Sequence, residues 1–129
     1  MKSTLLITSL FLTLCLSSAF ASGKSHKKTK HDRVLQIVNH QFEGTKQWLP
    51  GTLIVKSGEK IQLKLTNKTP SGIHGFRLWD SNHKNALITT NVPKGKTIET
   101  EFTAGKKGEI YQFDCHLHGA HVGGQIIVL

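Results

Sequence analysis

Short stretches in which apolar and polar residues alternate recur along the chain from Val34 to Leu129. The clearest covers residues 60–66, where one isoleucine and two leucines alternate with polar residues, as in a half-buried strand. Turns containing glycine or proline separate these stretches, and apolar residues never keep a helical period for three turns. The pattern predicts an all-β sandwich or small barrel of seven to eight strands. Strands are expected at residues 34–38, 52–56, 60–66, 73–79, 86–89, 97–102, 110–115 and 125–129.

The N-terminus has the pattern of a secretory signal peptide. Lys2 precedes an apolar run over residues 5–16, and Ala19-Phe20-Ala21 then matches a small-residue cleavage site. The apolar run is well short of the ~20 residues that a membrane span needs, so stable membrane insertion is not expected. We therefore expect a signal peptide at residues 1–21 and a periplasmic or secreted protein.

Residues 22–33 are rich in Lys, Arg and His and lack large apolar side chains. This predicts a basic, flexible N-terminal segment that precedes a single domain at residues 34–129. The whole chain has 17 Lys and Arg against 8 Asp and Glu. Such an excess would attract an acidic partner or anionic lipid headgroups, although the segment is also interpreted as a plain solvated spacer. No aromatic side chain interleaves the basic ones, so nucleic acid is not an expected partner.

Cleavage after Ala21 would remove Cys15, one of two cysteines, and leave Cys115 without a partner for an internal disulfide. Cys115 begins a run in which three histidines follow within six residues. Alternation along residues 110–115 places Cys115 on the same face as Tyr111 and Phe113, which are large enough for a core. These features predict that the Cys115 thiol is a metal ligand near the interior.

The other candidate ligands lie on loops. His118 and His121 follow the strand that ends at Cys115 and can turn back toward its sulfur, helped by the backbone freedom expected of glycines 119, 123 and 124. His74 opens the strand expected at 73–79 and could lie at the same end of the sandwich. One thiolate with imidazoles is the donor set of copper electron-transfer sites, although zinc accepts the same donors. The remaining histidines are interpreted as ordinary exposed side chains, with His26, His31, His40 and His83 kept as alternatives.

From about residue 34 to 129, the chain resembles the cupredoxins. The spacing Cys-x2-His-x2-His of residues 115–121 is similar to the amicyanin-type copper loop, and His74-Gly75-Phe76 and residues 123–128 fit the usual run of the family. The resemblance implies a Greek-key β-sandwich or barrel with one mononuclear copper per chain. It also implies that His74, Cys115 and His118 are the strong ligands. Nitrosocyanin-like (red copper) and amicyanin- or plastocyanin-like proteins are the most similar members.

The expected axial position departs from these patterns. His121 stands where amicyanin-type proteins place a methionine, and the single methionine, Met1, belongs to the expected signal peptide. A bound His121 would favour Cu(II), lower the reduction potential and draw the site toward tetragonal geometry. Gly75 departs as well, because many blue copper proteins carry an asparagine there. His116 is expected on the face opposite Cys115, toward solvent or a partner, rather than as a bridge to a second metal.

The resemblance implies one-electron transfer to a redox partner protein through a copper site with one cysteine and three histidine ligands. The basic surface of the chain would favour a partner with an acidic surface. The alternative is a nitrosocyanin-like site that binds or transforms a small molecule such as nitric oxide. No extra acid or base is placed for catalysis, so a non-enzymatic role is favoured. Copper storage is disfavoured because the mature chain would offer one cysteine and no methionine.

Overall fold

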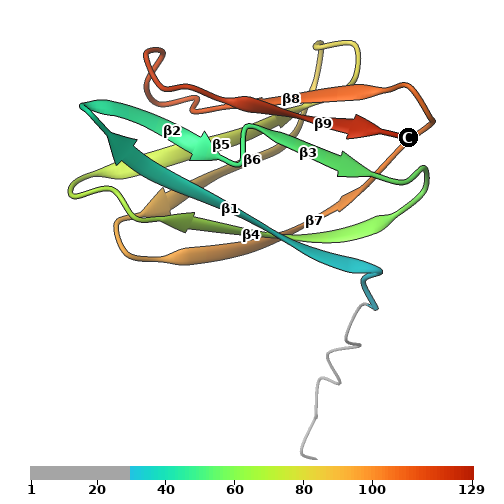
Figure 1. Ribbon diagram of the computed structural model, residues 1–129, viewed down its shortest axis with the longest axis horizontal. Helices are drawn as coiled ribbons and strands as arrows, with labels where there is room; N and C mark the ends of the chain where they lie inside the picture. The colour runs from blue at the N-terminus through green and yellow to red at the C-terminus, as the bar shows by residue number, and fades with distance from the viewer. Residues whose placement is uncertain (1–29) are drawn as a thin grey trace, which may run out of the picture.

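The computed structural model describes residues 30–129, and this part of the chain contains nine strands and no helix (Figure 1). The expected signal peptide, and residues 22–29 of the expected basic segment, lie outside the described residues. Within residues 30–129, no helix exists that could span a membrane. The strands are β1 (Arg33–Phe42), β2 (Thr45–Leu49), β3 (Thr52–Val55), β4 (Lys60–Asn67), β5 (Ile73–Trp79), β6 (Ala86–Pro93), β7 (Thr97–Thr103), β8 (Ile110–Asp114) and β9 (Gly124–Val128).

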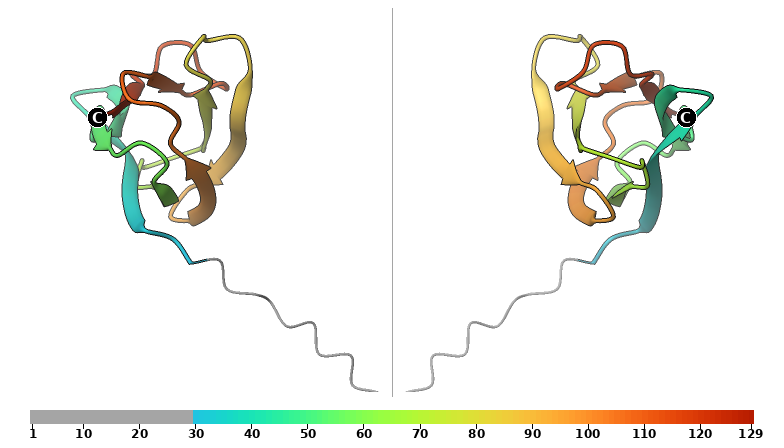
Figure 2. Two further views of the ribbon diagram at one scale, coloured as in Figure 1. Left: turned by 90° about the vertical axis from the view of Figure 1, so that its right-hand side faces the viewer. Right: turned by 90° about the vertical axis from the view of Figure 1, so that its left-hand side faces the viewer.

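The strands form two facing sheets, as the end-on views show (Figure 2). One sheet has the order β2-β1-β4-β7, and the other has the order β3-β9-β8-β5-β6. The pairs β1–β4 and β3–β9 are parallel, whereas the other paired strands are antiparallel. This arrangement confirms the predicted all-β, cupredoxin-like sandwich.

The core consists of the inward-facing residues of both sheets. Alternation in β4 buries Ile61, Leu63 and Leu65 completely, as its sequence predicts. Toward one end of the sandwich the core becomes aromatic: the Phe76 ring centroid lies 5.4 Å from both Trp48 and Phe113. Burying each of these rings contributes roughly 1.5–3 kcal/mol to folding. These aromatic side chains pack beneath His74 and Cys115. His74 lies two residues before Phe76 and Cys115 two residues after Phe113, so each faces the same side of its strand as that phenylalanine.

Strand β2 was not expected from the sequence. Its inward-facing positions are Lys46 and Trp48, and a lysine at an inward position conceals the apolar alternation. Strand β6 continues to Pro93, beyond the expected end at residue 89. Its last four residues include a single buried apolar side chain, Val92, so the sequence gives little sign of the extension. The structure therefore has one strand more than the upper end of the expected range.

Strand β1 begins at Arg33, whose Nε lies 2.8 Å from Glu59 Oε1. The preceding residue also contacts the domain, since the Asp32 amide donates to the Lys60 carbonyl at 2.8 Å. The start of β1 lies at the end of the sandwich that holds the C-terminus (Figure 1). The loop between β8 and β9 lies at the opposite end, beside the hairpin that joins β1 and β2.

Candidate metal centre

The four predicted ligands come together at this opposite end. Potential donor atoms of His74, Cys115, His118 and His121 all lie within 4.8 Å of one another. Cys115 Sγ lies 3.5 Å from His118 Nδ1, and the ring centroids of His74 and His121 are 4.8 Å apart. No other group of metal-binding side chains with this geometry occurs in residues 30–129. Two segments far apart in the sequence thus supply one compact set of donors.

Strand pairing explains how His74 meets Cys115. Strands β5 and β8 are antiparallel and pair at Arg77↔Asp114 and Leu78↔Phe113. The start of β5 therefore lies beside the end of β8, where Cys115 leaves the sheet. Cys115 is buried with Tyr111 and Phe113, which confirms the face predicted from alternation. Two local turns then bring the other ligands back: His118 N donates to Cys115 O, and His121 N donates to His118 O, both at 3.2 Å.

Strand β2 holds the ligand loop from the side. The Trp48 amide donates to Val122 O, and the Val122 amide donates to Lys46 O, both at 3.0 Å. On its other side the loop lies against β8, since a Cβ at Gly123 would lie 2.0 Å from the Phe113 carbonyl oxygen. Glycine is thus needed there for close approach. The expectation of special backbone freedom is wrong for glycines 119, 123 and 124, because none of them has a positive φ.

The buried imidazole of His74 is the strongest sign that the site takes a ligand. His74 is 1% exposed, and neither ring nitrogen completes a hydrogen bond with the protein. The Ser71 backbone lies close enough to act weakly on the ring but makes no hydrogen bond of ordinary geometry. An unsatisfied buried polar group costs about 1–3 kcal/mol. A metal ion coordinated by one of these nitrogens would remove much of that cost, so the residues fit a metal.

The electrostatics keep the histidines ready to coordinate. Burial lowers the pKa of His74, and the electrostatic effects of nearby Lys46 and His118 lower it further. Burial also lowers the pKa of His121 to about 4, with additional effects from His74, His118 and Lys46. Both imidazoles are therefore neutral at pH 7, and their lone pairs are available to a cation.

A buried asparagine supports the His74 side of the site. Asn67 is completely buried, and its Nδ2 donates to Val92 O at 2.9 Å and to Gly72 O at 3.2 Å. Its Oδ1 accepts from the Thr69 amide at 3.0 Å and from the Thr69 hydroxyl at 2.6 Å. These bonds fix the loop that precedes His74. Asn67 was not among the residues predicted from the sequence, and its only signal there is an asparagine just before the turn at residues 69–72.

The remaining histidines stay outside the site. His31 Nε2 lies 3.0 Å from Glu101 Oε1, His40 is exposed, and His83 stacks on Trp79. His26 lies outside the described residues. His116, expected to face solvent or a partner, is half-buried instead, with Nε2 3.1 Å from Asn91 Oδ1.

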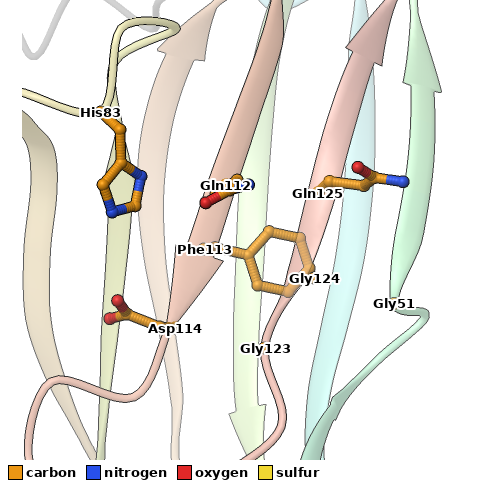
Figure 3. Close-up of a pocket in the computed structure, with 8 residues that line it drawn as sticks. All are labelled: Gly51, His83, Gln112, Phe113, Asp114, Gly123, Gly124 and Gln125. Carbon is orange, nitrogen blue, oxygen red and sulfur yellow. The ribbon is translucent and has the colours of Figure 1, made fainter.

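A separate hollow lies on the outer face of β8 and β9 (Figure 3). Its lining includes Gln112, Asp114 and Gln125, with His83 at its border. Asp114 accepts two hydrogen bonds from Arg77, at 3.0 and 2.9 Å, and one from Trp79 Nε1 at 2.9 Å. None of the four predicted ligands lines this hollow, so the metal chemistry does not belong to it.

A β-sandwich with one thiol and three imidazoles gathered at one end has the donor set of a small metal-binding protein. The sequence matches the family model for the cupredoxin-like domain over residues 6–128, and the chain therefore belongs to the cupredoxin family. Its cluster of three histidines and one cysteine is compatible with a copper site. A comparison with curated protein sequences returned no match.

Solved structures share the fold at low sequence identity. Auracyanin B superposes with a TM-score of 0.65 at 14% identity, covering 78% of this chain and 91% of that chain. Auracyanin A, described as a "blue" copper protein from Chloroflexus aurantiacus, gives a TM-score of 0.60 at 16% identity, over 74% and 99% of the two chains. Auracyanin from Roseiflexus castenholzii gives a TM-score of 0.61 at 16% identity and covers 75% of this chain and 96% of that chain.

Proposed function

We propose that His74, Cys115, His118 and His121 bind one copper ion and that the protein is an exported one-electron carrier. The observation that carries the proposal is the convergence of a buried thiol and a buried, unbonded imidazole with two loop imidazoles. Copper held by a thiolate and imidazoles supplies reversible one-electron transfer. The predicted signal peptide at residues 1–21 supports a location outside the cytoplasm.

The chain supplies preorganised ligands for the copper ion and one ligand through which an electron can reach the surface. His74 and Cys115 are buried, whereas His118 is exposed. The buried pair excludes water from one side of the centre, and the His118 ring offers an electron the shortest way out. Rigid support on both sides of the ligand loop keeps rearrangement small when the charge of the centre changes.

The surface around His118 suits a transient partner. Leu117, Val122 and Ile73, which are all exposed, lie next to the ligands in the sequence. Small apolar surfaces of this kind allow brief docking, while the basic excess of the chain speeds encounter with an acidic redox partner protein. The partner chemistry we propose is therefore an acidic protein surface that carries a redox centre.

Metal loading of the purified protein tests the proposal. Cu(II) should bind one ion per chain and produce an intense thiolate-to-copper absorption together with a Cu(II) EPR signal. Cys115→Ser should abolish that absorption, whereas His83→Asn should leave it intact because His83 lies outside the cluster. Reversible one-electron voltammetry should accompany the colour. Selective Zn(II) binding without stable Cu(II) binding would refute the proposal.

A second function is supported by His121. A third imidazole makes the centre richer in strong donors than one with a weak axial thioether, and it favours Cu(II) with tetragonal geometry. Such a centre could bind a small molecule such as nitric oxide. Titration of the reduced and oxidised copper protein with nitric oxide separates the two functions. A saturable spectral change at one equivalent supports this alternative, whereas unchanged spectra with fast electron exchange support electron transfer alone.

A further inference from the structure

We propose that His116 is a positioning residue that ties the ligand loop to strands β5 and β6 and thereby sets the geometry of the copper centre. The inference rests on the proposed copper site and goes beyond it, because His116 is not one of the four converging donors. It follows the ligand Cys115 directly in the chain. It contacts two residues, Gly75 and Asn91, that face each other across β5 and β6.

The first contact is with Gly75. A Cβ atom at Gly75 would lie 2.5 Å from His116 Nδ1 and 2.6 Å from Cε1, so the imidazole occupies the space that any other side chain would need. The φ of Gly75 is not positive, and its backbone conformation is therefore open to other residues. The His116 ring thus explains why glycine follows His74.

The second contact is a hydrogen bond to Asn91. His116 Nε2 donates to Asn91 Oδ1 at 3.1 Å. Asn91 is the β6 partner of Gly75, and the neighbouring pair along the ladder is His74↔Val92. One imidazole therefore contacts both members of the cross-strand pair adjacent to the ligand His74.

The contacts of His116 lie beyond the point where backbone pairing between β5 and β8 ends. The β5–β8 ladder pairs Arg77 with Asp114 and ends there, before it reaches Cys115. Backbone pairing therefore does not fix the separation of Cys115 and His74. His116 supplies the missing constraint, since it is bonded covalently to Cys115 and packs against the residue that follows His74.

A double-mutant cycle tests the packing without any metal. Gly75→Ala should lower the urea midpoint of the copper-free protein, because the new methyl group collides with the His116 ring. The same change in a His116→Ala background should lower the urea midpoint much less, because the ring that the methyl group would contact is absent. An equal loss of stability in both backgrounds would overturn the proposed tie, and this test holds whether or not the protein binds copper.

Spectroscopy of the copper protein tests the positioning. Groups that orient metal ligands typically change metal affinity by 10–100-fold when removed, so His116→Ala and Asn91→Ala should each weaken Cu(II) binding by about 10-fold. Both should also shift the thiolate absorption and the copper hyperfine splitting in the same direction, and the double variant should resemble the single ones. His40→Ala is the matched control, because His40 is exposed and outside the cluster.

The two proposals fail in different ways. If the unaltered protein binds no copper, the proposed function fails. The double-mutant cycle in urea still shows whether the His116 ring packs against Gly75. If the unaltered protein gives the copper spectrum and His116→Ala and Asn91→Ala reproduce it with unchanged affinity, His116 has no positioning role. Asn91→Ala also guards against misfolding, since it removes the hydrogen bond and keeps the ring against Gly75.

Discussion

In the proposed copper centre, individual side chains would act in opposite directions on the reduction potential. As a ligand, His121 would supply a strong σ-donor that favours the oxidised ion. Lys46 faces the same side of β2 as the buried Trp48, and its positive charge lowers the pKa of both His74 and His121. A charge that disfavours protonated imidazoles also disfavours the more highly charged copper ion. The reduction potential of the proposed centre would therefore reflect a balance between one ligand and one nearby charge.

Replacing His121 tests the ligand side of this balance. His121→Met exchanges an imidazole for a soft thioether, so the reduction potential should rise and the thiolate absorption should move toward that of a trigonal blue site. Voltammetry and EPR of the copper-loaded variant measure both effects. If His121→Met and His121→Ala leave spectrum and potential unchanged, His121 is not a ligand.

Replacing Lys46 tests the charge side. Lys46→Met keeps the length of the side chain and removes its charge, so the reduction potential should fall by an amount on the order of tens of millivolts at low salt. Lys46→Arg should preserve the potential, and Lys84→Met, in the distant turn after β5, is the matched control. A potential that rises or stays constant in Lys46→Met would show that the ammonium group does not act on the centre.

At the level of strands and loops, local patterns and long-range contacts differ in how far the sequence reveals them. Alternation in β4 and β8 predicts both the strands and the buried face of Cys115, because a strand directs successive side chains to opposite faces. The convergence of the four candidate ligands also follows the prediction. Strand β2 was not predicted, and neither was the pairing of His116 with Asn91. Each depends on residues that meet only after folding, and neither leaves a periodic trace in the sequence.

The loop before His74 gives a prediction at this level. Asn67→Ala removes the side chain that bonds Gly72, Val92 and Thr69, and it leaves buried backbone groups without partners. The copper-free protein should lose about 2 kcal/mol or more of stability in urea unfolding. Asn85→Ala, at an exposed turn, should lose much less. Similar losses in the two variants would show that the Asn67 bonds do not hold the loop.

Over the described part of the molecule, the loop between β8 and β9, which carries three of the four candidate ligands, lies at the opposite end of the sandwich from the two ends of the described chain (Figure 1). Buried imidazole nitrogens without hydrogen bonds occur at the loop end on His74, His116 and His121, whereas the one on His31 lies beside the Glu101 carboxylate. At the other end of the sandwich, charged side chains form ion pairs such as that of Arg33 with Glu59. The copper-free molecule therefore concentrates these unfavourable groups where a metal would bind, and metal loading should stabilise the fold as a whole.

This arrangement fixes how the stability of the copper-free protein depends on pH. The pKa of His121 falls to about 4 in the folded chain, against 6.5 as its ordinary value, and that of His74 is also lowered. Between these two pH values the unfolded chain binds more protons, so folding stability is full above pH 6.5 and declines as the pH falls toward 4. Urea midpoints measured across this range should drop with acidity, and His121→Phe should flatten the slope by removing one of the two groups. A midpoint that is constant or rises on acidification would show that these imidazoles are not held neutral by the fold.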